Sequence, residues 1–193
     1  MTTWPVSGTI GYIDAQTGAT PLALMKWAIQ SGDASVLSDM PSALSLAIGQ
    51  HGGSLGEVSA LLLLLGCVFM IVRKIITWHI PVSVLGSMAL FAFVVAWCNG
   101  GVSSLMYELP AFHLLAGGAM LGAIFMATDY VTSPMTAKGM IIYGIGIGVL
   151  TMIIRQWGAY PEGMSFAILI MNAVAPLINK YVKPRRFGMA SKK

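Results

Sequence analysis

The chain of 193 residues is 56% hydrophobic and only 9% charged, with a net charge of +4 at neutral pH. Soluble domains carry about 25% charged residues, so this composition excludes a soluble globular protein and indicates a polytopic membrane protein. Six of the eleven basic residues lie at or after Lys180, and no stretch interleaves basic with aromatic side chains, which excludes a nucleic-acid-binding surface. The two cysteines form no metal or disulfide pattern.

Residues 1–53 are the longest polar stretch and are predicted to form an extracytoplasmic segment with two short amphipathic helices. The apolar faces of these helices consist of Leu22, Met25 and Ile29 after Pro21, and of Leu44 and Ile48 after Pro41.

Five apolar segments follow within residues 54–182 and are predicted to cross the bilayer, before a basic cytoplasmic tail at residues 183–193. The predicted spans run over 54–73, 81–97, 113–128, 140–154 and 164–181. In the sequence SLGE, Ser54 as N-cap and Glu57 at the third helical position are predicted to form a capping box. Two pairs of small residues predict close helix packing. They are Gly118 with Gly122, and Gly144 with Gly148.

An odd number of spans places the two termini on opposite sides of the membrane. Arg73, Lys74 and Lys138 share one side with the basic tail, and positive charge favours the cytoplasm, so the N-terminal segment is predicted to lie outside. Arg155 is the one exception to this rule. It is predicted to form a surface ion pair with Glu162, with contact to a bound phosphate as the alternative.

Thr20 stands directly before Pro21, an arrangement typical of an N-cap threonine followed by proline at the first helical position. A phosphoryl group on its hydroxyl would lie at the positive end of the helix dipole, among N–H groups without an intrahelical partner. Gly18 and Ala19 leave room for a bulky substituent, and Asp14 opens the same run, DAQTGAT. The alternative is a plain N-capping threonine, worth about 1 kcal/mol.

Asp129 is the acidic residue of the apolar region, at the end of the third predicted span, where ionisable side chains are functional candidates. With Thr128 and Thr132 it could line a cofactor pocket or an ion path; alternatively, it caps a short turn near the interface. His79 and His113 are interpreted as anchors of helix ends at the interface. No hydrolytic triad, acid–base carboxylate pair or P-loop is recognisable, so any chemistry must come from a cofactor.

The run DAQTGATPL resembles the flavin-attachment motif of the RnfD/NqrB family of membrane subunits, where the last threonine carries FMN through a phosphoester bond. The resemblance continues in order through GGSLGEVSALLLLLG, WHIPVSVLGSMAL, HLLAGGAMLGAIFMATDYVTSPMT, YPEGMSFAILIMNAVAPLI and KYVKPRRFG. The junction TWHIP and the tail KPRR favour the RnfD branch.

This resemblance implies an all-α polytopic membrane protein that forms one half of a urea-transporter-like two-repeat fold, since family members have further spans before the flavin motif. On that basis Met1 is expected to be an internal residue of a longer reading frame, or the gene to be truncated. The implied function is a flavin-carrying subunit of a redox-driven, ion-translocating Rnf-type complex of the inner membrane, which relays electrons between ferredoxin and NAD.

The implied cofactor is FMN on Thr20, attached outside the cytoplasm by the flavin transferase ApbE, and a second, non-covalent flavin is left open. The implied partners are the other Rnf subunits and membrane lipid. Two alternatives remain: a passive channel or solute transporter of the same fold, with DAQTGAT as an ordinary loop, or a fragment that does not assemble. The coupling ion, sodium or proton, is left open because no set of ion ligands is recognisable.

Overall fold

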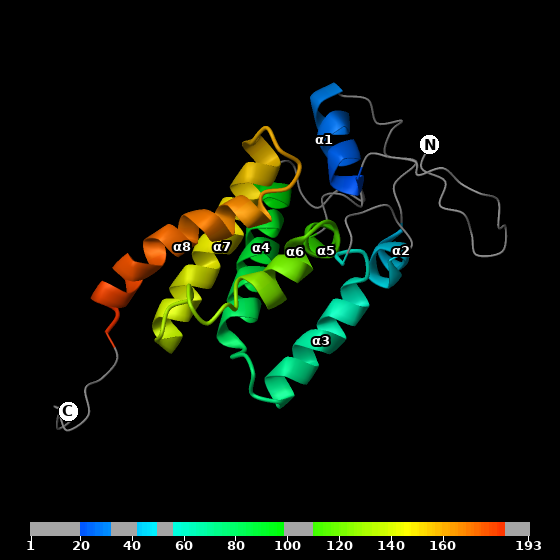
Figure 1. The fold of residues 1–193 in the computed structure, drawn as a ribbon. Helices are drawn as coiled ribbons and strands as arrows, with labels where there is room; N and C mark the ends of the chain where they lie inside the picture. The colour runs from blue at the N-terminus through cyan, green and yellow to red at the C-terminus, as the bar shows by residue number, and fades with distance from the viewer. Residues whose placement is uncertain (1–19, 32–41, 50–55, 99–109, 184–193) are drawn as a thin grey trace, which may run out of the picture.

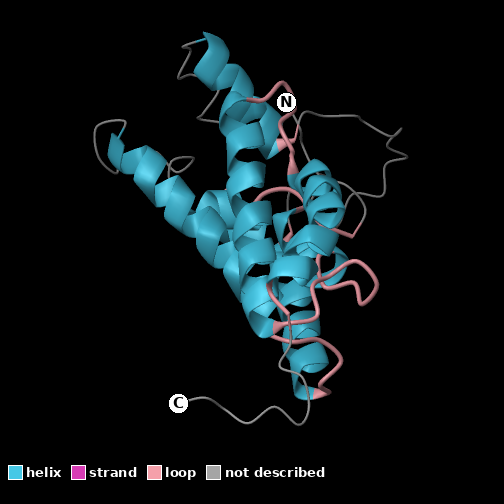
Figure 2. Ribbon diagram, turned by 90° about the vertical axis from the view of Figure 1, so that its left-hand side faces the viewer, coloured by secondary structure: helices cyan, strands magenta, loops and turns pink. Residues whose placement is uncertain are grey.

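The computed structural model describes residues 20–31, 42–49, 56–98 and 110–183, and their regular structure is entirely helical (Figures 1 and 2). In chain order the elements are α1 (Pro21–Ser31), α2 (Ala43–Ile48), α3 (Ala60–Val72), α4 (His79–Cys98), α5 (Pro110–Leu115), α6 (Ala119–Leu121), the π-helix η3 (Gly122–Met126), α7 (Ala137–Trp157) and α8 (Met164–Tyr181). The all-α fold class is therefore confirmed.

Three of the described helices are long and apolar enough to cross a membrane: α4 with 20 residues, α7 with 21 and α8 with 18. They correspond to the second, fourth and fifth predicted spans. The first predicted span corresponds to α3, which has 13 residues. At a rise of about 1.5 Å per residue α3 is shorter than a hydrocarbon core of about 30 Å. The membrane domain thus combines three spans with shorter apolar helices.

The core of the membrane domain lies where α7 packs between α4 and α8 (Figure 1). The pair Gly144 and Gly148 faces α4, so the predicted close approach of helix backbones is confirmed for this pair. A Cβ atom on Gly148 would lie 2.7 Å from the carbonyl oxygen of Val84. On the other side of α7, the Tyr143 hydroxyl donates to Asn172 Oδ1 of α8.

Alanine at Gly148 is expected to lower the free energy of unfolding by about 1–3 kcal/mol, because the added methyl group must push back the α4 backbone. The matched control is Gly86→Ala on α4, where a Cβ atom meets no atom within 4 Å. That change should leave stability unchanged or raise it by up to about 1 kcal/mol through helix propensity. Thermal unfolding of both variants in one detergent measures the difference; equal melting temperatures would refute the close α4–α7 contact.

The predicted capping box at the start of the first span is wrong. The helix α3 begins at Ala60, and its N-cap is Ser59, whose Oγ accepts from the Leu62 N–H at 3.4 Å. Gly56 has a φ of +92°, a backbone conformation outside the helical region, so a helix starting at Ser54 could not pass through it. Ser54 lies outside the described residues. Glu57 lies in the turn before α3, where it is only 8% exposed.

The third predicted span is not one continuous helix. It consists of α5, α6 and η3, and the chain breaks between α5 and α6 at Gly117, which has a φ of +68°. This left-handed conformation favours glycine and interrupts the ladder of helical hydrogen bonds. Broken helices at membrane depth are tolerated where other protein groups satisfy the freed backbone atoms.

The helices α1 and α2 pack on α5 through a small apolar cluster. Its buried members are Leu22, Met25, Leu46, Phe112 and Ala116. Burial of Leu22 and Met25 confirms the apolar face predicted for α1, whereas the side chain of Ile29 lies outside the described residues. In the six-residue α2 the side chain buried in this cluster is Leu46, whereas Leu44 and Ile48 of the predicted apolar face are exposed on the surface of the chain.

Candidate functional site

Thr20 is half-buried at the start of α1 and caps that helix as the sequence predicts. Its carbonyl oxygen accepts the first helical hydrogen bond, from the Leu24 N–H at 3.0 Å. Its hydroxyl oxygen Oγ1 accepts from the Ala23 N–H at 3.3 Å. Pro21 follows as the first helical residue. The other predicted residues of this motif, Asp14, Gly18 and Ala19, lie outside the described residues.

The position of α1 is determined by contacts to two parts of the membrane domain. Leu22 and Met25 are buried in the cluster with α2 and α5. On the other side, Lys26 Nζ donates to the carbonyl oxygens of Gly158 and Tyr160, the latter at 2.9 Å. Burial lowers the pKa of Lys26. The middle of α1 is thus anchored to the loop that joins α7 to α8.

Arg155, in the last turn of α7, is 1% exposed and shortly precedes this loop in the chain. Its Nη1 donates to the carbonyl oxygen of His113 at 2.5 Å, and its Nη2 to that of Ala116 at 3.1 Å. Arg155 therefore satisfies carbonyl groups at the end of α5, where the helix breaks. The predicted interaction with Glu162 is present, but it is not a surface ion pair because Arg155 is buried.

Two carboxylates face Arg155 from other segments of the chain. Glu57 comes from the turn before α3, and Glu162 from the loop before α8. The Gly118 N–H donates a hydrogen bond to the Glu162 carboxylate, and both carboxylates interact electrostatically with Arg155. Carboxylates close to a buried guanidinium offset the cost of burying its charge. We call Glu57, Arg155 and Glu162 the charged cluster.

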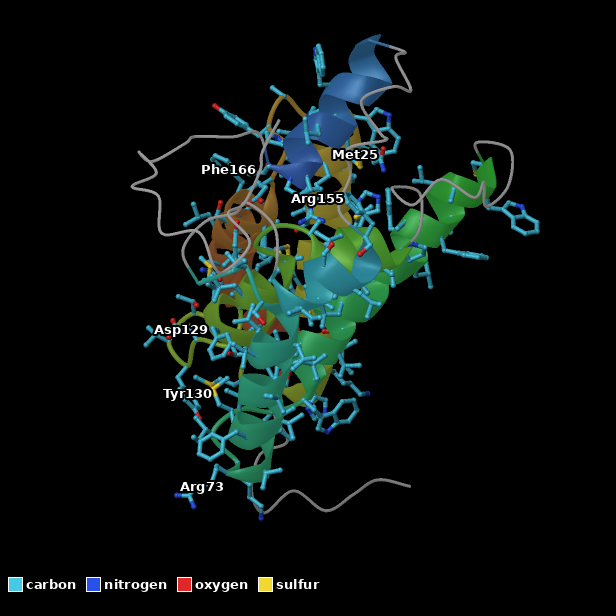
Figure 3. All side chains as sticks on the ribbon, turned by 90° about the vertical axis from the view of Figure 1, so that its right-hand side faces the viewer. Met25, Arg73, Asp129, Tyr130, Arg155 and Phe166 are labelled. Atoms are coloured by element: carbon cyan, nitrogen blue, oxygen red, sulfur yellow. The ribbon has the colours of Figure 1, made fainter. Side chains whose placement is uncertain are left out.

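Asp129 lies apart from the charged cluster, in an exposed turn between η3 and α7. Figure 3 places Met25 and Arg155 toward one end of the molecule, Arg73 at the other, and Asp129 between them. The Thr132 hydroxyl donates to Asp129 Oδ2 at 3.1 Å, and the Ser133 N–H to the Asp129 carbonyl oxygen at 3.2 Å. The Asp129 carboxylate thus bonds to a hydroxyl group of its own turn.

Thr128 and the two histidines lie apart from the Asp129 carboxylate in their hydrogen bonds and ring contacts. The Thr128 hydroxyl donates back to the Ile124 carbonyl oxygen at 2.6 Å. His113 is 2% exposed within α5, so its interpretation as an interface anchor is wrong. His79 agrees better with that interpretation, because it is half-buried at the start of α4 and stacks on Trp78 with ring centroids 4.3 Å apart.

The amino-acid sequence is similar to those of known membrane-protein subunits. The chain matches the model of the NQR2, RnfD, RnfE family over residues 1–188. It is 44% identical over 192 residues to a subunit of the proton-translocating ferredoxin:NAD(+) oxidoreductase complex of Clostridium ljungdahlii, covering 97% of this chain and 56% of the relative.

Two further relatives have similar coverage. The chain is 45% identical over 195 residues to a subunit of the Na(+)-translocating ferredoxin:NAD(+) oxidoreductase complex of Acetobacterium woodii, covering 98% of this chain and 56% of that protein. It is 39% identical over 197 residues to a subunit of the ion-translocating oxidoreductase complex of Pseudomonas paraeruginosa, with 97% and 56% covered. The chain therefore spans a little over half the length of these relatives.

Proposed function

The chain belongs to the NQR2, RnfD, RnfE family, and on that premise we propose that it is the flavin-carrying part of a membrane subunit in a redox-driven, ion-translocating electron transport complex. The observation that carries the proposal is the match over nearly the whole chain to relatives named as subunits of such complexes. The partners in this proposal are the other subunits of an Rnf-type complex, with ferredoxin and NAD as the electron carriers, and the surrounding lipid.

In this proposal FMN is joined through its phosphate to the Thr20 hydroxyl. The surroundings of Thr20 fit a phosphoester: the hydroxyl is half-buried, lies at the N-terminus of an 11-residue helix, and has the Ala23 N–H within reach. Pro21 has no N–H to satisfy, and Lys26 holds the same helix against the loop after α7. The flavin would supply the electron-transfer chemistry, and these residues would hold and orient its phosphate.

We place the N-terminal segment outside a bacterial or archaeal cytoplasmic membrane and the C-terminus in the cytoplasm, so that the flavin transferase ApbE reaches Thr20 from outside. Arg73 after α3 supports this orientation, since it is exposed and lies at the end of the molecule opposite Met25 of α1 (Figure 3). Lys138 is likewise exposed, at the start of α7. Arg155 does not conflict with the positive-inside rule, because the carboxylates of Glu57 and Glu162 neutralise its charge.

The names of the relatives include both proton and sodium as the translocated ion. The relatives from Clostridium ljungdahlii and Acetobacterium woodii are 44% and 45% identical to this chain, and their names give proton and sodium respectively. Overall identity at this level does not separate the two ions.

Purification from native membranes tests the proposed role against a passive channel. The tagged chain, extracted in mild detergent, is expected to bring with it partner subunits that contain iron–sulfur clusters and to support ferredoxin-dependent reduction of NAD. A passive channel predicts instead solute flux through liposomes that contain the chain alone, with no bound flavin. Flux without flavin or partner subunits would refute the proposed function.

A further inference from the structure

A groove with a volume of about 420 Å³ runs between α4 and α7 and is open at the surface of the membrane domain. Its sides consist of large apolar side chains: Val82, Leu90 and Phe91 of α4, and Ile141, Ile145 and Val149 of α7. Gly86 lies one turn from Val82 and one turn from Leu90 on the same face of α4. A Cβ atom on Gly86 would meet no atom within 4 Å, so the groove is empty where this side chain is missing.

The hydroxyl groups that line the groove already have hydrogen-bond partners. The Ser83 hydroxyl donates to the Ile80 carbonyl oxygen, and the Ser87 hydroxyl to that of Val84, both at 3.0 Å. Both O–H donors are therefore used within α4. A polar solute that entered the groove would lose hydrogen bonds to water without gaining these donors, which favours an apolar occupant.

The length of the groove matches one leaflet of a bilayer. The lining residues of α4 extend from His79 to Phe91, about 18 Å at a rise of about 1.5 Å per residue. The hydrocarbon core is about 30 Å thick, so each leaflet contributes about 15 Å. Trp78 lines one end of the groove and is exposed, as is typical of tryptophan at the membrane–water interface. The groove therefore begins at the interface and extends through the apolar part of one leaflet.

A cationic side chain lies at the same end of the groove as Trp78. The Thr77 hydroxyl, just before α4, donates to Met140 Sδ in the first turn of α7 at 3.3 Å, so both helices begin at this end. Lys138 is exposed and stands three residues before Ile141, which places both on one face of α7. A lysine at the interface attracts anionic lipid headgroups.

A hydrocarbon chain fits this groove better than a helix of another protein does. A helix about 10 Å wide would occupy roughly 1,400 Å³ over a length of about 18 Å, several times the volume of the groove. Helices that pack closely in lipid also need small residues along the contact. Here Gly86 stands between the exposed side chains of Val82 and Leu90, which keep a helix backbone away.

We infer that the groove binds an acyl chain of an anionic phospholipid, with the headgroup beside Trp78 and Lys138. The apolar sides of the groove hold the chain, and the ammonium group of Lys138 selects the charge of the headgroup. Because the groove is formed by α4 and α7, this lipid site requires no flavin on Thr20.

Native mass spectrometry of the purified, delipidated chain tests the headgroup. Phosphatidylglycerol and phosphatidylcholine with identical acyl chains are added separately, and the dissociation constant of the first bound lipid is measured for each. The wild type is expected to bind phosphatidylglycerol about fivefold more tightly, the effect of one lysine near the membrane surface. Lys138→Gln should remove this preference. Lys180→Gln, which changes an exposed lysine of α8 outside the groove, is the control and should retain it.

The same measurement on Gly86→Leu tests the groove. The added side chain fills the open space, so the tightest binding event should be lost for both lipids. Ala173→Leu, the same kind of change at an exposed position of α8, is the control and should bind lipid like the wild type. If Gly86→Leu does not fold, Ile145→Trp, at an exposed residue on the other side of the groove, decides in its place.

Three results would overturn the inference. One is an equal affinity of the wild type for both lipids, or a preference that Lys138→Gln retains. Another is a tight binding event that persists in Gly86→Leu, because the lipid would then bind elsewhere. The third is a dimer of the wild-type chain that Gly86→Leu dissociates, which would identify a second copy as the occupant of the groove.

Discussion

Alanine at Thr20 is expected to remove all covalently bound flavin from the chain. The hydroxyl oxygen is the atom that would form the phosphoester, and alanine has no atom that can replace it. After co-expression with the flavin transferase, wild-type protein should fluoresce in a denaturing gel, and the Thr20→Ala band should be dark. Loss of the N-cap alone costs about 1 kcal/mol, so the variant should still fold.

Two control variants make this result specific. Thr17→Ala changes the other threonine of DAQTGAT and should keep the fluorescence. Thr20→Ser keeps a hydroxyl oxygen that can both cap α1 and accept a phosphoryl group, so its band should remain visible. A fluorescent Thr20→Ala band, or a dark Thr17→Ala band, would contradict the assignment of the flavin to Thr20.

Methionine at Arg155 is expected to destabilise the chain by about 3–5 kcal/mol, because the change removes the buried guanidinium that interacts with the buried Glu57 and the half-buried Glu162. It also removes the donors to the carbonyl oxygens of His113 and Ala116 at the end of α5. For a chain of this size the melting temperature should fall by about 10 °C. Thermal unfolding in detergent, followed by circular dichroism, measures the change.

The matched control is Lys138→Met, the same kind of change at an exposed position of α7, which should alter stability by no more than about 0.5 kcal/mol. Adding Glu162→Gln to Arg155→Met should recover part of the lost stability, because it removes one of the uncompensated charges. Equal melting temperatures for Arg155→Met and Lys138→Met would contradict the buried charged cluster.

The long membrane helices were predictable because a continuous apolar run in lipid has few alternatives to a helix. The predicted spans 81–97, 140–154 and 164–181 correspond closely to α4 (His79–Cys98), α7 (Ala137–Trp157) and α8 (Met164–Tyr181). The break at Gly117 was not predictable, because the sequence shows a glycine but not whether its φ is positive. The same holds for Gly56, whose turn delays the start of α3.

Of the candidate site, only the features that depend on neighbouring residues in the sequence were predictable. The N-cap role of Thr20 follows from the adjacent Pro21 and the apolar pattern of α1, all within one short stretch of sequence. The charged cluster joins Glu57, Arg155 and Glu162, which come from three separate segments and meet only through tertiary packing. The available signal was Arg155 itself, a basic residue at the end of a predicted span that departs from the positive-inside rule.

Peptide mapping by mass spectrometry tests the central claim most directly. The chain co-expressed with the flavin transferase is digested, and fragment ions locate any added mass within the peptide that contains both Thr17 and Thr20. We predict the mass of FMN less one water on Thr20 alone. An unmodified Thr20 in protein that carries flavin, or the same mass on Thr17, would contradict the account.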